Sequence, residues 1–268
     1  MFMHIHLISD ATGAMGEHVL QAVLTQFPPQ TFTVQAHAFV NTEARLTACL
    51  QRIQHTGGIV VHATVYPALK QRIETTCRAL ALPAHDLTQP IAAFLGAVSG
   101  THPVPNYQRL HELTPDYFRR VAAIEYTIEH DDGRGLPTLG AADVVLTGPS
   151  RTTKTPTSMV LAVRGYRAAN VPLVRGVEPP QELVRVPPRR VVCLTAQPAT
   201  VAAFRQARIT TELGHDSGDY ADVQAIRAEL AAAHRLSGVH GWSELDVTDC
   251  AVEETAAHVI RMITASPD

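Results

Sequence analysis

The sequence has few cysteines and no long apolar run, and these absences exclude several classes of protein. Its 268 residues include four cysteines, none of them spaced as a CxxC pair, so neither a disulfide framework nor a zinc ribbon is indicated. No apolar run approaches the ~20 residues of a membrane-spanning helix, and the first ten residues lack the basic and apolar regions of a secretory signal. We therefore expect a cytoplasmic protein with reduced thiols and no membrane association.

Charge is also scarce and nearly balanced. Charged residues make up 18% of the chain and the net charge is −3, which excludes a protein that coats nucleic acid by bulk electrostatic attraction. Apolar residues make up 46%, too many for a mainly disordered chain. Among the 22 basic residues only Lys70 and Lys154 are lysines. Two lysines could persist by chance, but a lysine in an arginine-rich chain also marks a place where a compact ammonium group is needed.

Alternating strand and helix patterns predict an α/β protein. Residues 59–65 form a continuous β-branched run, as in a buried parallel strand, and a helical pattern follows from Pro67 to Leu80. Repeated strand–helix–strand units at this spacing predict parallel sheets with crossover helices. The predicted strands cover residues 4–9, 31–39, 59–65, 142–147, 171–174, 190–195 and 244–247.

A segment rich in proline and glycine divides the chain into two predicted parts. Residues 99–105 read SGTHPVP, a composition typical of a linker. A chain of 268 residues fits two modest domains if a domain holds roughly 150 residues. We predict an N-terminal parallel-sheet α/β region over residues 1–100 and a second α/β domain over residues 106–268.

The predicted strand at residues 142–147 runs directly into the motif GPSRTTKTPTS and then into a helix. The Walker A pattern is glycine, four residues, then Gly-Lys-Ser/Thr. Gly148, Lys154 and Thr155 comply, whereas Thr153 replaces the second glycine. Backbone N–H groups and the helix dipole favour an anion at such a turn. The second domain is therefore predicted to be P-loop-containing and kinase-like, although an ordinary polar turn is the alternative.

Each part of this loop has a predicted role. Lys154 contacts the phosphates as a point charge, together with Arg151, and Thr155 offers its hydroxyl to Mg²⁺. Pro156 is tolerated early in the helix. The residues predicted to bind the nucleotide are Gly148, Pro149, Ser150, Arg151, Thr152, Thr153, Lys154 and Thr155.

Two adjacent acidic residues precede the loop in the sequence HDDG. Asp131 and Asp132 are candidates for a general base that accepts a hydroxyl proton, or for Mg²⁺ ligands. His130 could orient them or act itself. The alternative is a solvated turn at the end of a helix.

Asp10 and a pair of histidines near the N-terminus are further candidates for binding residues. Asp10 follows the first predicted strand, where ligands of open α/β sheets bind, so it could contact a partner or a nucleotide, although capping of the next helix by Asp10 or Thr12 is the favoured interpretation. His4 and His6 share one face of that strand, but no third and fourth ligand falls at a convincing spacing. We therefore predict no structural metal site among the histidines.

The loop also resembles that of a known family, the pyruvate, phosphate dikinase regulatory proteins and their sister group that regulates phosphoenolpyruvate synthase. HLISDATG, EYTIEHDDG, RAANVPLVRGV and EETAAHVI resemble the family in the same order, so the resemblance covers nearly the whole chain. The sequence departs from the family loop at Pro149 and Thr153. Thr152 and Thr153 resemble the branch that regulates the dikinase more than the other branch.

The resemblance implies a bifunctional enzyme. Such an enzyme phosphorylates a threonine of pyruvate, phosphate dikinase with ADP as donor, which inactivates the dikinase. It also removes this phosphate with inorganic phosphate as acceptor, which releases pyrophosphate. ADP, and by expectation Mg²⁺, are then the cofactors, the dikinase or the synthase is the protein substrate, and a homodimer is conceivable.

Other functions remain open from the residues alone. A P-loop kinase of a small metabolite would use the same cradle for ATP, without a protein acceptor. A nucleotide-binding module without catalysis would bind ADP and phosphorylate no dikinase. Lys154, Arg151, Asp131 and Asp132 are the predicted catalytic residues of an enzyme.

Overall fold

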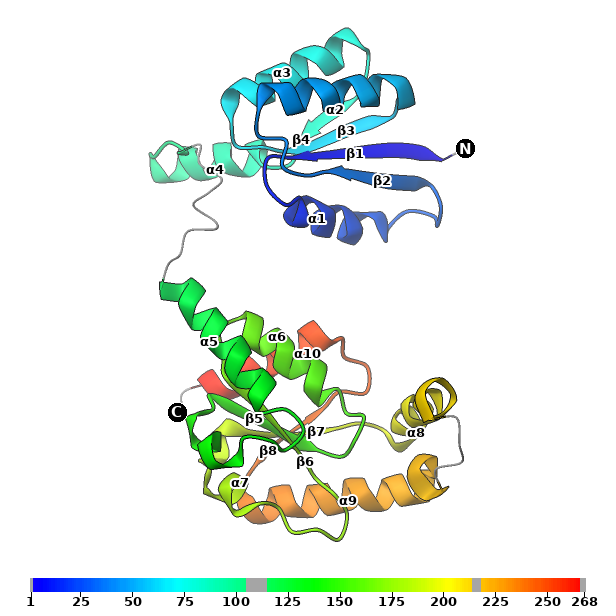
Figure 1. Ribbon diagram of the computed structural model, residues 1–268, viewed down its shortest axis with the longest axis vertical. Helices are drawn as coiled ribbons and strands as arrows, with labels where there is room; N and C mark the ends of the chain where they lie inside the picture. The colour runs from blue at the N-terminus through cyan, green and yellow to red at the C-terminus, as the bar shows by residue number, and fades with distance from the viewer. Residues whose placement is uncertain (1, 105–114, 214–217, 266–268) are drawn as a thin grey trace. The chain divides into compact units, whose positions relative to one another are not determined.

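A computed structural model describes residues 2–104, 115–213 and 218–265. Its contacts divide the chain into two units, Met1–Glu112 and Leu113–Asp268, drawn in Figure 1. Within the predicted linker, α4 ends at Ser99, residues 101–104 have no regular secondary structure, and residue 105 lies outside the described ranges. None of the described helices is long and apolar enough to span a membrane.

The first unit contains one parallel sheet in the order β2-β1-β3-β4. Side chains of β1 alternate between its faces: Leu7 packs with Leu20 of α1, and Ile8 packs with Leu46 of α2 and Ile73 of α3. Helix α1 therefore covers one face, and α2 and α3 cover the other (Figure 1). The elements are β1 (Met3–Ser9), α1 (Ala14–Leu24), β2 (Phe32–His37), α2 (Glu43–Thr56), β3 (Ile59–Ala63), α3 (Pro67–Ala79), β4 (Ala84–Asp86) and α4 (Gln89–Ser99).

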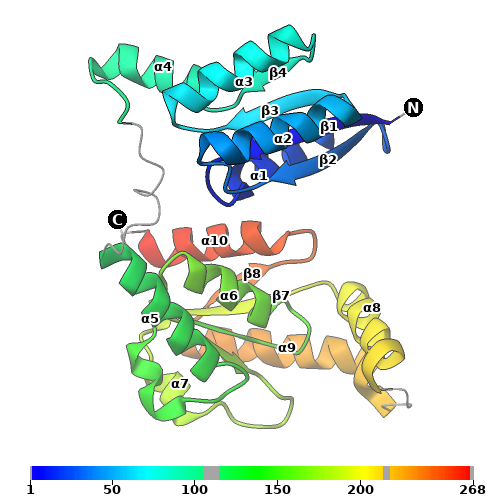
Figure 2. The same cartoon turned by 45° about the horizontal axis from the view of Figure 1, so that its top comes forward.

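The second unit repeats this architecture with the sheet order β6-β5-β7-β8, again all parallel. Leu161 of α6 and Val259 of α10 pack on one face, and Leu183 of α7 and Ala233 of α9 pack on the other, as Figure 2 shows for α6, α10 and α9. The main elements are α5 (Pro115–Glu129), β5 (Val144–Gly148), α6 (Lys154–Val163), β6 (Ala168–Pro172), α7 (Gln181–Arg185), β7 (Val191–Thr195), α8 (Pro198–Arg208), α9 (Val223–His240), β8 (Ser243–Asp246) and α10 (Val252–Thr264).

The strand order positions the carboxyl end of β5 for ligand binding. The chain leaves β5 for its neighbour β6 and later crosses to β7 on the opposite side of β5. Ligands of open α/β sheets bind at such a reversal of strand order, beyond the carboxyl ends of the strands. The loop of residues 148–155 begins at this reversal of strand order, where a ligand is expected to bind. The two parallel sheets with helices on both faces confirm the predicted α/β fold.

Some elements differ from the sequence-based expectation. Strand β4 has only three residues, too few for a clear pattern. Helix α4 was not predicted either, although Ile91, Phe94, Leu95 and Val98 have the spacing of an amphipathic helix. The strand predicted at residues 171–174 covers Ala168–Pro172 instead, because its alanines pack in the core although they are weak strand formers. The segment 176–190 has the proline- and arginine-rich composition of a surface loop, but it contains the short helix α7.

Candidate functional site

Gly148 ends β5 and begins the 148–155 loop. Its φ is +126°, and a Cβ atom at this position would lie 2.3 Å from the carbonyl oxygen of Leu194. Only glycine permits both this backbone conformation and this approach of β5 to β7. The Gly148 carbonyl also accepts a hydrogen bond of 3.0 Å from the Leu173 amide. The first glycine of the motif therefore fixes where the loop leaves the sheet.

The loop then turns through two left-handed residues. Arg151 has φ +68° and Thr153 has φ +57°, a region that is unfavourable for a β-branched side chain. Thr153 occupies the position where the Walker A pattern has its second glycine, directly before α6 begins at Lys154. The conformation thus explains why glycine suits this position, and it shows that this chain holds a strained threonine there.

Lys154 folds back over the loop. It is 6% exposed, and its Nζ donates a 2.6 Å hydrogen bond to the Pro149 carbonyl, which also accepts from the Thr152 hydroxyl at 3.0 Å. Burial lowers the pKa of Lys154 to about 8, although nearby Asp132 acts to raise it. The ammonium group is therefore charged at neutral pH. It lies over the turn that precedes α6, at the positive end of the helix dipole.

Asn170 of β6 joins the acidic turn to the loop. Its Nδ2 donates to Asp131 Oδ1 at 2.7 Å and to Asp132 Oδ1 at 3.2 Å, and lies 3.0 Å from the Thr155 hydroxyl oxygen. That hydroxyl donates to Asp131 Oδ1 at 3.1 Å. Backbone hydrogen bonds between Asn170 and the turn, from Gly133 N at 2.8 Å and to His130 O at 2.9 Å, fix the register. The structure thus brings Asp131, Asp132 and Thr155 together.

Sequence reasoning missed Asn170. The one signal is a polar residue inside the otherwise apolar strand AANVP, where its side chain is 1% exposed. A buried amide requires partners, so such a residue points to a polar site at the end of a strand. The carboxylates that it contacts are 38 and 39 residues away in sequence, and this pairing depends on β6 lying next to the acidic turn that follows α5.

His130 does not contact the two carboxylates through its ring. Its Nδ1 is hydrogen-bonded to the Tyr126 carbonyl at 2.7 Å and its Nε2 to the Thr138 hydroxyl at 2.8 Å, and the ring stacks on Tyr126 at 3.7 Å. Both ring nitrogens are therefore engaged in holding the helix end against the following segment. The interpretation of His130 as the base or as an orienting group is wrong for this structure.

The loop and the acidic turn enclose a cavity of about 300 Å³. Of the predicted residues, Gly148, Pro149, Thr152 and Asp131 do not line it, and α8 contributes two residues that were not predicted. The lining residues are Asp132, Ser150, Arg151, Thr153, Lys154, Thr155, Pro156, Asn170, Pro172, Phe204 and Arg208. There is accordingly room for an anion beside Lys154.

Arg205 of α8 fixes the loop from the other side. It is 1% exposed, and its guanidinium forms a two-pronged ion pair with Glu229 of α9, at 2.6 and 3.0 Å. The same group donates to the Ser150 carbonyl at 3.2 Å and to the Tyr220 carbonyl at 2.9 Å. Its position in α8 gives no sequence signal for this role, because the fold alone brings α8 against the loop.

Oxygen atoms at the acidic turn suit a hard divalent cation. Asp131, Asp132 and the Thr155 hydroxyl converge there, and Asn170 Oδ1 is buried without a hydrogen-bond partner among the described residues. Mg²⁺ in nucleotide sites is held by one or two carboxylates together with phosphate oxygens and water, so these residues fit it. In the described part of the chain no cluster of three His, Cys, Asp or Glu side chains forms a metal site.

Two buried histidines of the first unit, His6 and His37, pair with each other. His6 Nδ1 and His37 Nε2 share a hydrogen bond of 3.1 Å, and His6 Nε2 lies 3.0 Å from the Gly57 carbonyl. Burial lowers the pKa of both side chains. Neutral rings at the core of the sheet explain these histidines structurally.

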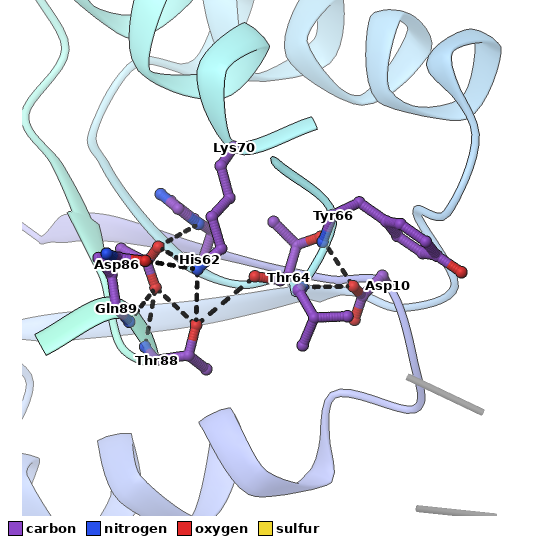
Figure 3. A network of polar contacts seen from close by, with 9 residues as sticks. Asp10, His62, Thr64, Tyr66, Lys70, Asp86, Thr88 and Gln89 are labelled. Atoms are coloured by element: carbon purple, nitrogen blue, oxygen red, sulfur yellow. Dashed lines mark hydrogen bonds and ion pairs between the residues drawn. The ribbon is translucent and has the colours of Figure 1, made fainter. Parts of the chain in front are cut away.

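Asp10 joins two strands rather than capping α1. Its Oδ2 accepts from the Thr64 hydroxyl at 2.8 Å and from the Val65 amide at 2.7 Å (Figure 3). The N-cap of α1 is Gly13, with no side-chain hydrogen bond. Capping by Asp10 is therefore wrong, because the carboxylate instead ties the end of β1 to the residues that follow β3. Of the two predicted capping residues, Thr12 is the one near the helix, where its hydroxyl accepts from the Ala14 amide at 3.4 Å.

The second lysine lies in the same network. Lys70 Nζ contacts Asp86 Oδ2 at 2.8 Å, the Thr88 hydroxyl at 3.1 Å and Gln89 Oε1 at 3.4 Å, and Figure 3 shows it directed at this group of acceptors. Burial alone would raise the pKa of Asp86, but Lys70 and the hydrogen bonds from Thr88 and Gln89 lower it to about 2. Three acceptors around one ammonium group explain a lysine here, because its three donors are not planar.

The chain is similar to known proteins over nearly its whole length. A family model described as kinase/pyrophosphorylase matches residues 5–260. Proteins named pyruvate, phosphate dikinase regulatory protein are similar over nearly the full chain. One from Caulobacter vibrioides is 38% identical over 98% of this chain and 84% of its own length. One from Rhodopseudomonas palustris strain TIE-1 is 38% identical over 98% and 94%.

The family match and the similarity to the relatives extend over nearly the whole sequence and not only over the loop. A third relative, from Nitrobacter hamburgensis, is also 38% identical, over 97% of this chain and 93% of its own. The matched range 5–260 includes both units and every residue of the cavity. The chain belongs to the kinase/pyrophosphorylase family.

Proposed function

We propose that the protein regulates pyruvate, phosphate dikinase by transferring the β-phosphoryl group of ADP to a threonine of that enzyme, and by removing it with inorganic phosphate. One observation carries this proposal: a single cavity has the Lys154 ammonium and Arg151 as cationic lining and the Asp132 carboxylate as its acidic lining. Phosphoryl transfer needs a positive charge for the moving group and a base for the attacking hydroxyl. The names of the similar proteins support the dikinase as partner.

In the forward direction the threonine hydroxyl attacks the β-phosphorus of ADP. The bond from this phosphorus to the bridging oxygen breaks, AMP leaves with the bonding electrons, and the hydroxyl proton passes to a base. Asp132 suits that role because it lines the cavity, whereas Asp131 accepts hydrogen bonds from Thr155 and Asn170. Lys154 and Arg151 stabilise the negative charge on the phosphoryl group in transit.

The second reaction has phosphate, not AMP, as acceptor and so is not the reversal of the first. A free phosphate attacks the phosphorus of the phosphothreonine, the bond from this phosphorus to the threonine oxygen breaks, and pyrophosphate forms. The proton that the attacking phosphate loses passes through Asp132 to the threonine oxygen. Both reactions therefore require the site to bind a diphosphate: that of ADP, the donor, in phosphorylation, and pyrophosphate, the product, in dephosphorylation. Mg²⁺, held by Asp131, Thr155 and Asn170, would neutralise phosphate charge when it is bound.

The test uses purified dikinase in its phosphohistidine form. Incubation with ADP labelled at the β-phosphorus is expected to place label on a dikinase threonine, and later addition of phosphate is expected to release labelled pyrophosphate. ATP hydrolysis coupled to a small metabolite, with no label on the dikinase, would overturn the proposal. Labelling of phosphoenolpyruvate synthase in place of the dikinase would correct the partner.

A further inference from the structure

Helix α8 presents one of its faces to the cavity. Phe204 and Arg208 line the cavity, and residues four apart lie on the same side of a helix. Val201 and Arg205, also four apart, form the buried face of α8. Helix α8 therefore has one face buried in the second unit and another, which includes Phe204, that lines the cavity.

Phe204 differs in character from the rest of the cavity. It is 52% exposed, and among the described residues that line the cavity it is the single aromatic side chain. Its surroundings include Ser150, Arg151 and Arg208. A half-exposed aromatic ring among cations and hydroxyls matches the needs of a nucleotide, whose base stacks on an aromatic face while its phosphates meet positive charge.

The two sides of the loop carry different chemistry. Strand β6, with Asn170, lies on one side of β5, and β7, which leads into α8, lies on the other. The acidic turn therefore approaches the loop from the β6 side, and Phe204 from the β7 side. A diphosphate bound in the loop would therefore have its reacting end toward Asp132 and its other end toward α8.

We propose that Phe204 forms the nucleoside subsite, stacking on the base of the nucleoside diphosphate donor. This inference rests on the proposed function, because it assigns the ends of the donor within the same cavity. It has a distinctive consequence. The forward reaction contains a nucleoside, whereas phosphorolysis uses phosphate and produces pyrophosphate, and neither of these carries a base.

A variant without the Phe204 ring should affect ADP-dependent phosphorylation and leave phosphate-dependent dephosphorylation nearly unchanged. Phe204→Ala is expected to raise KM for ADP and to weaken ADP binding by roughly tenfold to a hundredfold, the range that loss of one stacked base gives. KM for phosphate and the affinity for pyrophosphate stay within about twofold of wild type. Phe204→Tyr restores ADP affinity because the aromatic face is kept.

Phe118→Ala is the matched control, because Phe118 is 58% exposed and does not line the cavity. It is expected to leave both affinities unchanged, and thermal melting of each variant shows that the fold is retained. Calorimetric titration of ADP and of pyrophosphate, without dikinase, gives the binding values independently of catalysis.

The outcomes keep this inference and the proposed function apart. If the wild-type protein binds ADP more tightly than pyrophosphate and Phe204→Ala removes the difference, the subsite is supported even if no dikinase is labelled. If Phe204→Ala leaves ADP affinity unchanged, or weakens ADP and pyrophosphate equally, the subsite is wrong while ADP-dependent labelling can still stand.

Discussion

The side-chain amide of Asn170 donates a 2.7 Å hydrogen bond to Asp131. Through this contact a residue of β6 determines where the acidic turn lies relative to the loop at the end of β5. The neighbouring Asp132 accepts a second bond from the same amide at 3.2 Å. The position of the proposed base therefore depends on a side chain that does not itself react.

Replacing Asn170 by alanine is expected to slow both reactions. Without the amide, the two carboxylates lose their shared donor, and a displacement of about 1 Å is enough to cost roughly a hundredfold in rate. We expect kcat to fall about tenfold to a hundredfold in both directions, with KM for ADP changed less than threefold. Steady-state kinetics on the dikinase measure this, and a rise in KM with unchanged kcat would show that Asn170 acts in binding instead.

The buried ammonium group of Lys154 predicts a pH dependence. Because burial lowers its pKa to about 8, the free protein loses this charge as the pH rises through that value. The profile of kcat/KM for ADP, which reports groups of the free enzyme, is expected to fall above about pH 8. Lys154→Arg keeps its charge, so any residual activity of that variant shows no such fall.

The lowered pKa of Lys154 affects stability in the opposite sense: activity should fall with rising pH, whereas the free energy of unfolding should rise. The ordinary pKa of lysine is 10.5 and that of Lys154 is about 8, so between these values the unfolded chain binds more protons than the folded one. The contribution of Lys154 to the free energy of unfolding therefore rises with pH in this window. Denaturant titrations of wild type and Lys154→Met isolate it, and a contribution that falls with pH would contradict the burial argument.

Relief of backbone strain at Thr153 is expected to stabilise the second unit. A left-handed residue other than glycine costs about 1–2 kcal/mol, and Thr153 has φ +57°. Thr153→Gly should therefore raise the free energy of unfolding by about 1 kcal/mol, reduced by the extra freedom of glycine in the unfolded chain. Thr200→Gly, inside α8, is the control and should destabilise by about 0.3–0.5 kcal/mol, the difference in helix propensity between the two residues. Equal loss of stability in both variants would show that Thr153 is not strained.

Lys70 is expected to tolerate no exchange for arginine. Its three acceptors lie within 2.8–3.4 Å of one nitrogen, and a planar guanidinium does not fit this arrangement. Lys70→Arg should destabilise the first unit by about 1–2 kcal/mol. Arg72→Lys alters an exposed ion pair with Glu43 and should change stability by less than about 0.5 kcal/mol. Chemical denaturation compares them, and equal effects would argue against a specific role for Lys70.

The sequence predicted those parts of the site whose residues are neighbours in the chain. Gly148, Lys154 and Thr155 were identified because a strand, a turn and a helix follow one another within a short motif. Asn170 was not, because its contact with Asp131 exists only once β6 lies against the acidic turn. Phe204 and Arg205 were missed for the same reason, since the helical pattern of α8 does not say which face meets the loop.

The first unit shows the same distinction. Its strand and helix pattern predicted the sheet, whereas α4 was missed although its apolar residues have helical spacing; in the structure none of them is buried. Asp10 was expected to act locally on α1, but it binds residues 54 and 55 positions away. Local patterns therefore predicted elements well, and partners distant in sequence were not accessible to them.

The central claim is that one anion site at Lys154 serves both reactions. The most direct test compares ADP-dependent phosphorylation and phosphate-dependent dephosphorylation of the dikinase by Lys154→Met, after melting has shown that the variant is folded. Loss of both activities by at least a hundredfold is the predicted result. A variant that no longer phosphorylates but still releases pyrophosphate at the wild-type rate would contradict the account.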